Sequence, residues 1–249
     1  MKPIRDFVWW YLKRKNMVAV PSEIARIMMP NQSATFAAAL ARLRKRNLKL
    51  GTVIDIGASD GRWTREVLPL FPAARFLCVE AQPAHEAKLK DFVSKHSEVE
   101  YALCAAGERV GQTSFDATDL LGGWVQNRPG GLHSITVPMS TVDQLVKDRQ
   151  LCEPFLIKLD THGYELPILA GAAATLQKTD ALVVEVYNLP AGPPAVPFYE
   201  FCRWIAGHGF RCIDMFDPLY RPLDAAFWQM DLLFLRDTRP EFQELAYSR

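Results

Sequence analysis

The sequence predicts an α/β protein with a doubly wound, mostly parallel sheet, an antiparallel last strand and a helical extension at the amino terminus. From Thr52 onward, short β-branched runs alternate with helical windows, a pattern typical of parallel strands joined by crossover helices. Two runs, 155–159 and 181–185, are almost continuously apolar, as expected for strands covered on both faces. The first 50 residues instead have the apolar spacing of helices.

Seven strands and five helices are expected after residue 50. The strands are expected at 52–57, 75–80, 98–104, 154–160, 180–187, 210–216 and 228–235, and the helices at 61–70, 83–95, 140–149, 163–176 and 197–208. The connection between the last two strands contains Pro218 and Pro222 and is too short for a crossover helix. The final strand is therefore expected to be antiparallel.

The segment 105–139 interrupts this alternation with several glycines among short polar runs. It is too long for a plain connection. We expect two short strands, near 112–116 and 133–137, that flank a mobile loop able to close over a site.

Length and charge indicate one domain with an appendage. We expect a basic helical extension at 1–50, a main α/β domain at 51–237 and a tail at 238–249. The extension holds 11 Lys and Arg against Asp6 and Glu23, whereas the remainder is acidic, with 18 basic and 26 acidic residues. An acidic main surface opposes phosphates, so we expect no nucleic-acid partner.

The expected location is the cytoplasm, or at most a membrane surface. Five scattered cysteines lack metal-ligand spacing and are interpreted as small buried side chains in a reducing compartment. The apolar runs are too short to span a membrane. Residues 7–12 are largely aromatic and precede Lys13, Arg14 and Lys15, which suits either an anionic lipid surface or a helical cap packed on the sheet. We favour the cap.

The stretch VIDIGASDG, residues 53–61, predicts a ligand-binding turn after the first strand. Gly57 permits a sharp turn, and Gly61 opens the next helix, whose free N–H groups face the ligand. Ser59 and Arg62 stand where a dinucleotide motif has its second and third glycines. Asp55 and the neighbouring Asp60 favour a ligand with an ammonium group over a diphosphate.

Glu80 ends the second strand, 23 residues after Gly57. A carboxylate there can accept hydrogen bonds from both ribose hydroxyls of a nucleoside, as in NAD sites and S-adenosylmethionine sites alike. The turn and the antiparallel last strand favour S-adenosylmethionine.

Four segments resemble the FkbM family of S-adenosylmethionine-dependent methyltransferases. These are VIDIGASDG, then FLCVEAQP at 76–83, LIKLDTHGYEL at 156–166 followed by Leu169 and Gly171, and QMDLLF at 229–234. The resemblance covers about residues 48–236, and KLDTHGYELPILAG is its most specific part. It implies a class I methyltransferase fold and methyl transfer to a hydroxyl of a sugar, glycan or secondary metabolite.

Carried over by position, the resemblance implies a set of cofactor-binding residues. The turn would line the methionine and ribose, Glu80 would hold the ribose, and Cys104 to Ala106 would flank the adenine. The expected cofactor-binding residues are Asp55, Gly57, Ala58, Ser59, Gly61, Glu80, Ala81, Ala105 and Asp160. His162 departs from the family, which often has glutamine or glutamate there.

Methyl transfer to a hydroxyl needs alignment and a base for one proton. Free alkoxide formation, from a pKa of ~15.7 to a carboxylate near ~4, costs about 15 kcal/mol, so the proton should leave as the new bond forms. Asp160, His162 and Glu185 follow strands and are the catalytic candidates, while Glu165 is interpreted as stabilising a helix start. In an alternative, Asp160, Glu185 and Asn188 hold Mg²⁺. Two further functions stay open: a non-catalytic nucleoside-binding module and an NAD-dependent oxidoreductase.

Overall fold

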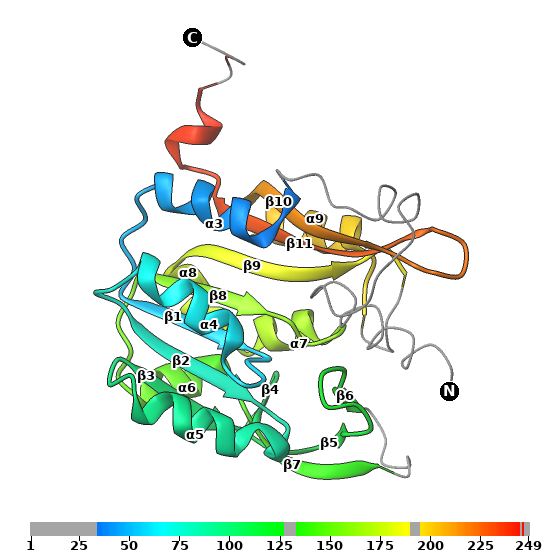
Figure 1. Cartoon of the computed structure of the whole chain (residues 1–249). Helices are drawn as coiled ribbons and strands as arrows, with labels where there is room; N and C mark the ends of the chain where they lie inside the picture. Colours follow the sequence, from blue (N-terminus) through cyan, green and yellow to red (C-terminus); the bar gives the residue numbers. More distant parts are fainter. Residues whose placement is uncertain (1–33, 127–132, 190–194, 245, 247–249) are drawn as a thin grey trace, which may run out of the picture.

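The computed structural model describes residues 34–126, 133–189, 195–244 and 246. Its centre is a seven-stranded sheet in the order β3-β2-β1-β8-β9-β11-β10 (Figure 1). In chain order these strands are β1 (Thr52–Ile56), β2 (Arg75–Glu80), β3 (Val99–Leu103), β8 (Phe155–Leu159), β9 (Thr179–Tyr187), β10 (Phe210–Tyr220) and β11 (Phe227–Arg236). All seven predicted strands are confirmed, most of them within two residues at each end.

Strand directions also follow the prediction. β1 pairs in parallel with β2 and β8, and β8 with β9, whereas β11 is antiparallel to both β9 and β10. The predicted antiparallel last strand is therefore confirmed. β10 continues four residues beyond its predicted end because the β10–β11 hairpin extends past the edge of the sheet.

Helices cover both faces of the sheet and form two apolar cores. One face carries α3 (Phe36–Lys45), α4 (Arg62–Val67) and α5 (Glu86–Ser94), and the other α6 (Val142–Asp148), α7 (Glu165–Ala170), α8 (Ala173–Gln177) and α9 (Phe198–Ala206). Short 3-10 helices occupy Leu68–Leu70, Pro83–His85 and Pro240–Phe242. The helix predicted at 163–176 is instead two helices, because the chain turns at Gly171 and Ala172.

A second, four-stranded sheet lies in the segment that interrupts the alternation. Its order is β4-β7-β5-β6, with β4 (Ala105–Ala106), β5 (Gly111–Asp116), β6 (Trp124–Gln126) and β7 (Ser134–Ser140). The two predicted strands are confirmed as β5 and β7, whereas β4 and β6 were not predicted. Part of the predicted mobile loop, 127–132, lies outside the described residues.

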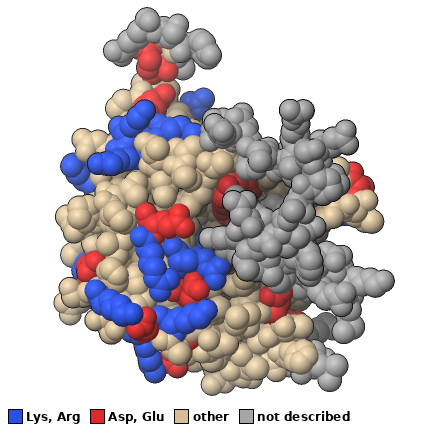
Figure 2. Space-filling model, in the orientation of Figure 1, with Lys and Arg blue, Asp and Glu red and all other residues tan. Residues whose placement is uncertain are grey.

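The described end of the amino-terminal extension packs on the sheet. Thr35 caps α3 by accepting a hydrogen bond from the N–H of Ala38 at 3.2 Å. Arg42 forms two hydrogen bonds with Asp214 on β10, at 2.6 and 2.8 Å. Basic side chains of this helix lie on the same face as those of α4 and α5, with carboxylates among them (Figure 2). Residues 1–33, including the aromatic run, lie outside the described residues, and the boundary at residue 50 stays a prediction.

The expectation of five buried cysteines is wrong for two of them. Cys78 and Cys104 are buried and Cys202 is partly buried, whereas Cys152 and Cys212 are exposed. Cys152 lies in the loop before β8, and Cys212 lies on β10 at the edge of the sheet, where one flank is open to solvent. Within the described residues, no helix is long and apolar enough to cross a membrane.

Candidate active site

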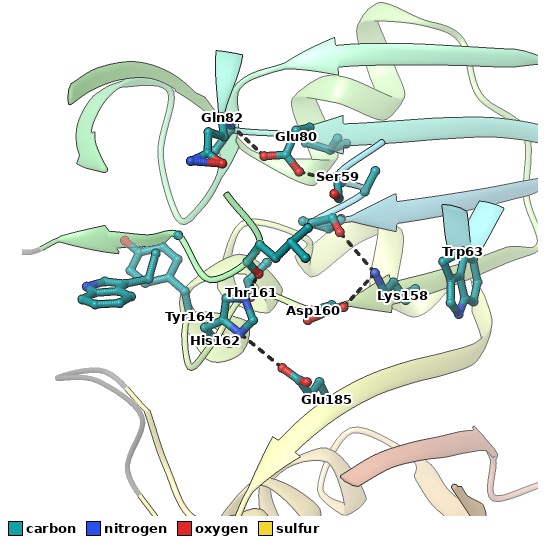
Figure 3. A pocket seen from close by; sticks show the side chains of 18 of the residues that line it. Ser59, Trp63, Glu80, Gln82, Lys158, Asp160, Thr161, His162, Tyr164 and Glu185 are labelled. Carbon is teal, nitrogen blue, oxygen red and sulfur yellow. Dashed lines mark hydrogen bonds and ion pairs between the residues drawn. The ribbon is translucent and has the colours of Figure 1, made fainter. Parts of the chain in front are cut away.

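A cavity of about 460 Å³ opens at the carboxyl ends of the parallel strands. Glu80 and Ser59 lie on one side of it, and Lys158, Asp160 and Glu185 on the other (Figure 3). β10, β11 and the small sheet complete its walls. Ligands of doubly wound sheets bind at this edge because the strand order reverses there, here between β1 and β8.

Glu80 is held by the backbone at the end of β2. One carboxylate oxygen accepts a hydrogen bond from the N–H of Ser59 and the other from the N–H of Gln82, both at 2.7 Å. Each oxygen keeps a second lone pair, so the carboxylate can accept two further hydrogen bonds from a ligand diol. Burial raises the pKa of Glu80, and the two backbone donors work against that rise.

The turn after β1 is built from left-handed residues. Gly57, Ser59 and Gly61 have φ angles of 78°, 52° and 79°, and this winding directs the N–H of Ser59 toward Glu80. A Cβ at position 57 would lie 2.0 Å from the backbone oxygen of Asp160, so β1 and β8 can approach this closely only with glycine. Gly57, Ala58 and Ser59 all line the cavity.

Three successive backbone carbonyls tie the loop 117–123 to the cavity wall. The oxygen of Asp119 accepts from the amide of Gln82 at 3.2 Å, that of Leu120 meets His85 Nε2 at 2.7 Å, and that of Leu121 meets His162 Nε2 at 3.0 Å. The loop thereby brings Leu120 and Leu121 beside an apolar wall made by Ala81, Cys104, Ala105 and Ala106. Such a wall suits the flat face of a nucleobase.

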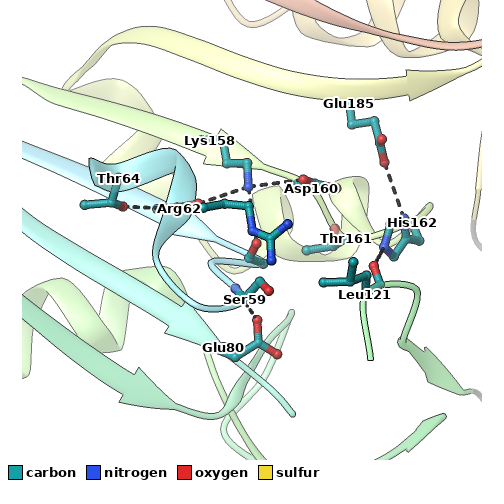
Figure 4. A network of polar contacts seen from close by, with 12 residues as sticks. Ser59, Arg62, Thr64, Glu80, Leu121, Lys158, Asp160, Thr161, His162 and Glu185 are labelled. Atoms are coloured by element: carbon teal, nitrogen blue, oxygen red, sulfur yellow. Dashed lines mark hydrogen bonds and ion pairs between the residues drawn. The ribbon is translucent and has the colours of Figure 1, made fainter. Parts of the chain in front are cut away.

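Lys158 is the buried cation at the centre of the site. It is 6% exposed and lies 3.1 Å from Asp55 and 3.2 Å from Asp160, and it donates to the backbone oxygen of Gly57 (Figure 4). Burial alone lowers the pKa of Lys158, but Asp160 and Asp55 together raise it above its ordinary value. Likewise, burial tends to raise the pKa of Asp160, while Lys158 and His162 bring it below its usual range. Both charges are therefore retained.

Two residues expected to contact the cofactor do not line the cavity. Asp55 is 1% exposed, and its carboxylate pairs with Lys158 and accepts from the hydroxyl of Thr64 at 2.7 Å. Gly61 packs against α5, and an added Cβ at this position would lie 2.7 Å from the ring of Phe92. Asp55 thus holds Lys158 and Gly61 permits close packing. The other seven expected cofactor residues all line the cavity.

His162, one of the three catalytic candidates, is a hydrogen-bond donor at both ring nitrogens, which argues against a role as the base. Nε2 meets the carbonyl of Leu121, which can only accept, and Nδ1 lies 3.3 Å from Glu185 and 2.9 Å from the hydroxyl of Tyr187. Burial lowers the pKa of His162, but Glu185 and Asp160 outweigh it and raise the pKa to about 10. An imidazolium has no lone pair with which to take a proton.

Glu185 is also fully engaged. Its carboxylate accepts hydrogen bonds from the hydroxyl of Tyr187 and the amide of Gln229, and it pairs with His162. Burial and the charge of Asp160 raise the pKa of Glu185 to about 7. Glu165, by contrast, accepts from the N–H of Gly163 at 3.0 Å and stabilises the turn before α7, as interpreted from the sequence.

Sequence reasoning missed several lining residues. Lys158 carries a clear signal, a lysine inside an apolar strand. Gln229 and Asp231 lie on β11, and because β11 is antiparallel its first residues reach the edge where parallel strands end. Phe36 reaches the cavity from α3, and Trp63 from α4, with ring centroids 6.3 Å apart. Nothing local in the sequence links these two rings.

The donor set does not favour a divalent cation. Asp160, His162 and Glu185 place ligand-type atoms within 4.8 Å of one another. However, both His162 nitrogens carry protons in their hydrogen bonds, and Lys158 already neutralises Asp160. Asn188, the third ligand of the Mg²⁺ alternative, donates its amide to the carbonyl of Phe227 at 3.1 Å and does not line the cavity. Lys158 and His162 thus pair with the carboxylates that a metal ion would need as ligands.

The strand order together with the antiparallel β11 defines a class I methyltransferase fold. The family model described as the methyltransferase FkbM domain matches residues 55–212, and the chain belongs to this family. A curated relative, the 2-O-methyltransferase NoeI of Sinorhizobium fredii, is 26% identical over 150 residues. That match covers 53% of this chain and 62% of NoeI, so it spans less than two thirds of the relative.

Solved structures with a similar fold include two methyltransferases. One is a putative tRNA (m1A22) methyltransferase of Streptococcus pneumoniae in complex with S-adenosyl-L-methionine, with 13% identity, a TM-score of 0.44, and coverage of 80% of this chain and 72% of that one. The other is a putative RNA methyltransferase of Pyrococcus horikoshii, with 13% identity, a TM-score of 0.44, and coverage of 81% and 85%. Both TM-scores lie below 0.5, so no property of either protein is carried over to this chain.

Proposed function

We propose that the protein transfers the methyl group of S-adenosylmethionine to a hydroxyl oxygen of a sugar, a glycan or a similar polyhydroxylated molecule. The observation that carries the proposal is Glu80, a buried carboxylate with a free lone pair on each oxygen at the end of β2. Family membership supports methyl transfer, and the name of the relative NoeI, a 2-O-methyltransferase, supports oxygen as the acceptor atom.

The cavity fits the cofactor by its chemistry. Glu80 would hold the ribose, the apolar wall at Ala105 and Ala106 would flank the adenine, and the carboxylates of Asp160 and its neighbours would face the methionine ammonium. When bound, S-adenosylmethionine supplies an electrophilic methyl group. The chain's own residues hold and orient the ligands, exclude water and take up the hydroxyl proton.

The acceptor side of the cavity suits hydroxyl groups. The carboxylates of Glu185 on β9, Asp217 on β10 and Asp231 on β11 lie there, with the aromatic side chains Phe36 and Phe216. Carboxylates accept hydrogen bonds from hydroxyls, and aromatic faces cover the apolar faces of sugar rings. An anionic acceptor is disfavoured by the same carboxylates.

The test is an acceptor screen. The full chain is incubated with methyl-labelled S-adenosylmethionine and a panel of neutral sugars, amino sugars and oligosaccharides, and the products are analysed by mass spectrometry and NMR. A methyl ether is the expected product, and the variant Glu80→Ala should form much less of it at the same S-adenosylmethionine concentration. Methyl groups on nitrogen or carbon would overturn oxygen specificity, and tight binding of S-adenosylhomocysteine without any turnover would favour a non-catalytic binding module.

A further inference from the structure

Asp231 occupies a position on β11 that brings its carboxyl group to the centre of the acceptor side. It pairs directly with Glu185 of β9 and lies next to Phe216 of β10 in the strand register. Directly paired residues of antiparallel strands project from the same face of the sheet. Asp231 and Glu185 therefore both line the cavity.

Asp231 differs from every other candidate base in having no protein partner. Among the described residues no hydrogen bond or ion pair reaches its carboxylate, although its backbone is fixed in the sheet. Asp160 is paired with Lys158, Glu185 accepts from Tyr187 and Gln229, and His162 donates at both nitrogens. A fixed, unpartnered carboxylate on a cavity wall is available to a ligand.

We propose that Asp231 is the general base that accepts the proton of the acceptor hydroxyl. This inference rests on the proposed function. As the acceptor oxygen forms its bond to the methyl carbon, the carbon–sulfur bond breaks with both electrons staying on sulfur. The hydroxyl proton passes to the Asp231 carboxylate, which yields the methyl ether and neutral S-adenosylhomocysteine, and the proton then leaves to solvent.

The charges around Asp231 fit this role. Burial raises its pKa well above the ordinary value, and Glu185 on β9, Asp160 after β8 and Asp217 on β10 raise it further, while Lys158 on β8 opposes them. A base works best when its pKa lies near the working pH. Cationic S-adenosylmethionine in the same cavity favours the ionised carboxylate, so binding of the cofactor prepares the base.

The first test compares Asp231→Asn with Asp224→Asn. Asp224 is an exposed aspartate in the turn of the same hairpin, paired with Arg221. Asp231→Asn should bind S-adenosylhomocysteine within about threefold of wild type yet lose about 100-fold or more in kcat on any acceptor found in the screen. Asp224→Asn should match wild type. Unchanged kcat in Asp231→Asn, with wild type active, would overturn the inference while leaving the proposed function intact.

The second test needs no acceptor. Titration calorimetry at pH 7 in two buffers of different ionisation enthalpy gives the number of protons released when S-adenosylmethionine or S-adenosylhomocysteine binds. Wild type should release more protons with S-adenosylmethionine, because only its sulfur is charged, and Asp231→Asn should reduce this difference. An equal difference in Asp231→Asn would overturn the inference. If wild type binds neither compound, the proposed function fails, and the inference fails with it.

Discussion

The two sides of the cavity are built in different ways. On the side of β1 and β2, Glu80 is positioned by backbone N–H groups that lie two and 21 residues away in the sequence. On the side of β8, β9 and β11, side chains position one another, and the contact between Glu185 and Gln229 spans 44 residues. The first side is a local motif, and the second exists only once the sheet is complete. Substitutions should therefore affect the two sides differently.

The largest effect is expected at Lys158. Replacing it with methionine leaves Asp55 and Asp160 without their shared cation, and loss of one partner from a buried ion pair costs about 3 to 5 kcal/mol in the free energy of unfolding. Urea denaturation measures this loss of stability. The control Lys178→Met removes an exposed pair with Glu153 and should change stability by less than about 1 kcal/mol. Equal stabilities of the two variants would contradict the central role of Lys158.

The next effect concerns cofactor affinity. Glu80→Ala removes a buried charged acceptor, and the loss of hydrogen bonds to it should weaken S-adenosylhomocysteine binding about 100-fold, or about 2.7 kcal/mol. Isothermal titration calorimetry measures it, with Glu153→Ala, an exposed carboxylate before β8, as the matched control. An affinity for Glu80→Ala within threefold of wild type would exclude Glu80 as the ribose ligand.

His162 should show an effect that depends on pH. Its folded pKa of about 10 lies above the unfolded value of about 6.5, so its charge stabilises the fold fully below about pH 6.5, and this contribution is lost as pH rises through 10. His162→Gln keeps a donor for Leu121 but loses the ion pair with Glu185, so it should cost about 2 kcal/mol at pH 7. Thermal denaturation at pH 7 and pH 10 should show a difference from wild type that shrinks at the higher pH. A constant difference would indicate a neutral histidine.

The smallest effect is expected from chelation. Because Lys158 and His162 already neutralise Asp160 and Glu185, EDTA should leave both the melting temperature and the methyl-transfer rate unchanged. If EDTA abolished activity and Mg²⁺ restored it, the conclusion that these side chains do not favour a divalent cation would be wrong.

The sequence predicted the side of the cavity that local patterns determine. Strand β1, its turn and Glu80 are recognisable because apolar runs, glycines and a strand-ending carboxylate occur close together in the chain. Asp231 was not assigned a role, because its place at the carboxyl edge follows from the antiparallel direction of β11 and its register with β9. The sequence also named His162 as one of three candidate bases, and it did not show that the carbonyl of Leu121, 41 residues away, fixes one ring nitrogen as a donor.

A crystal structure of the full chain with S-adenosylhomocysteine tests the division of the cavity most directly. We expect both ribose hydroxyls on the carboxylate of Glu80, the adenine against Ala105 and Ala106, and the sulfur facing the wall formed by Asp160 and Asp231. A ribose bound away from Glu80, or a sulfur directed away from that wall, would contradict this expectation.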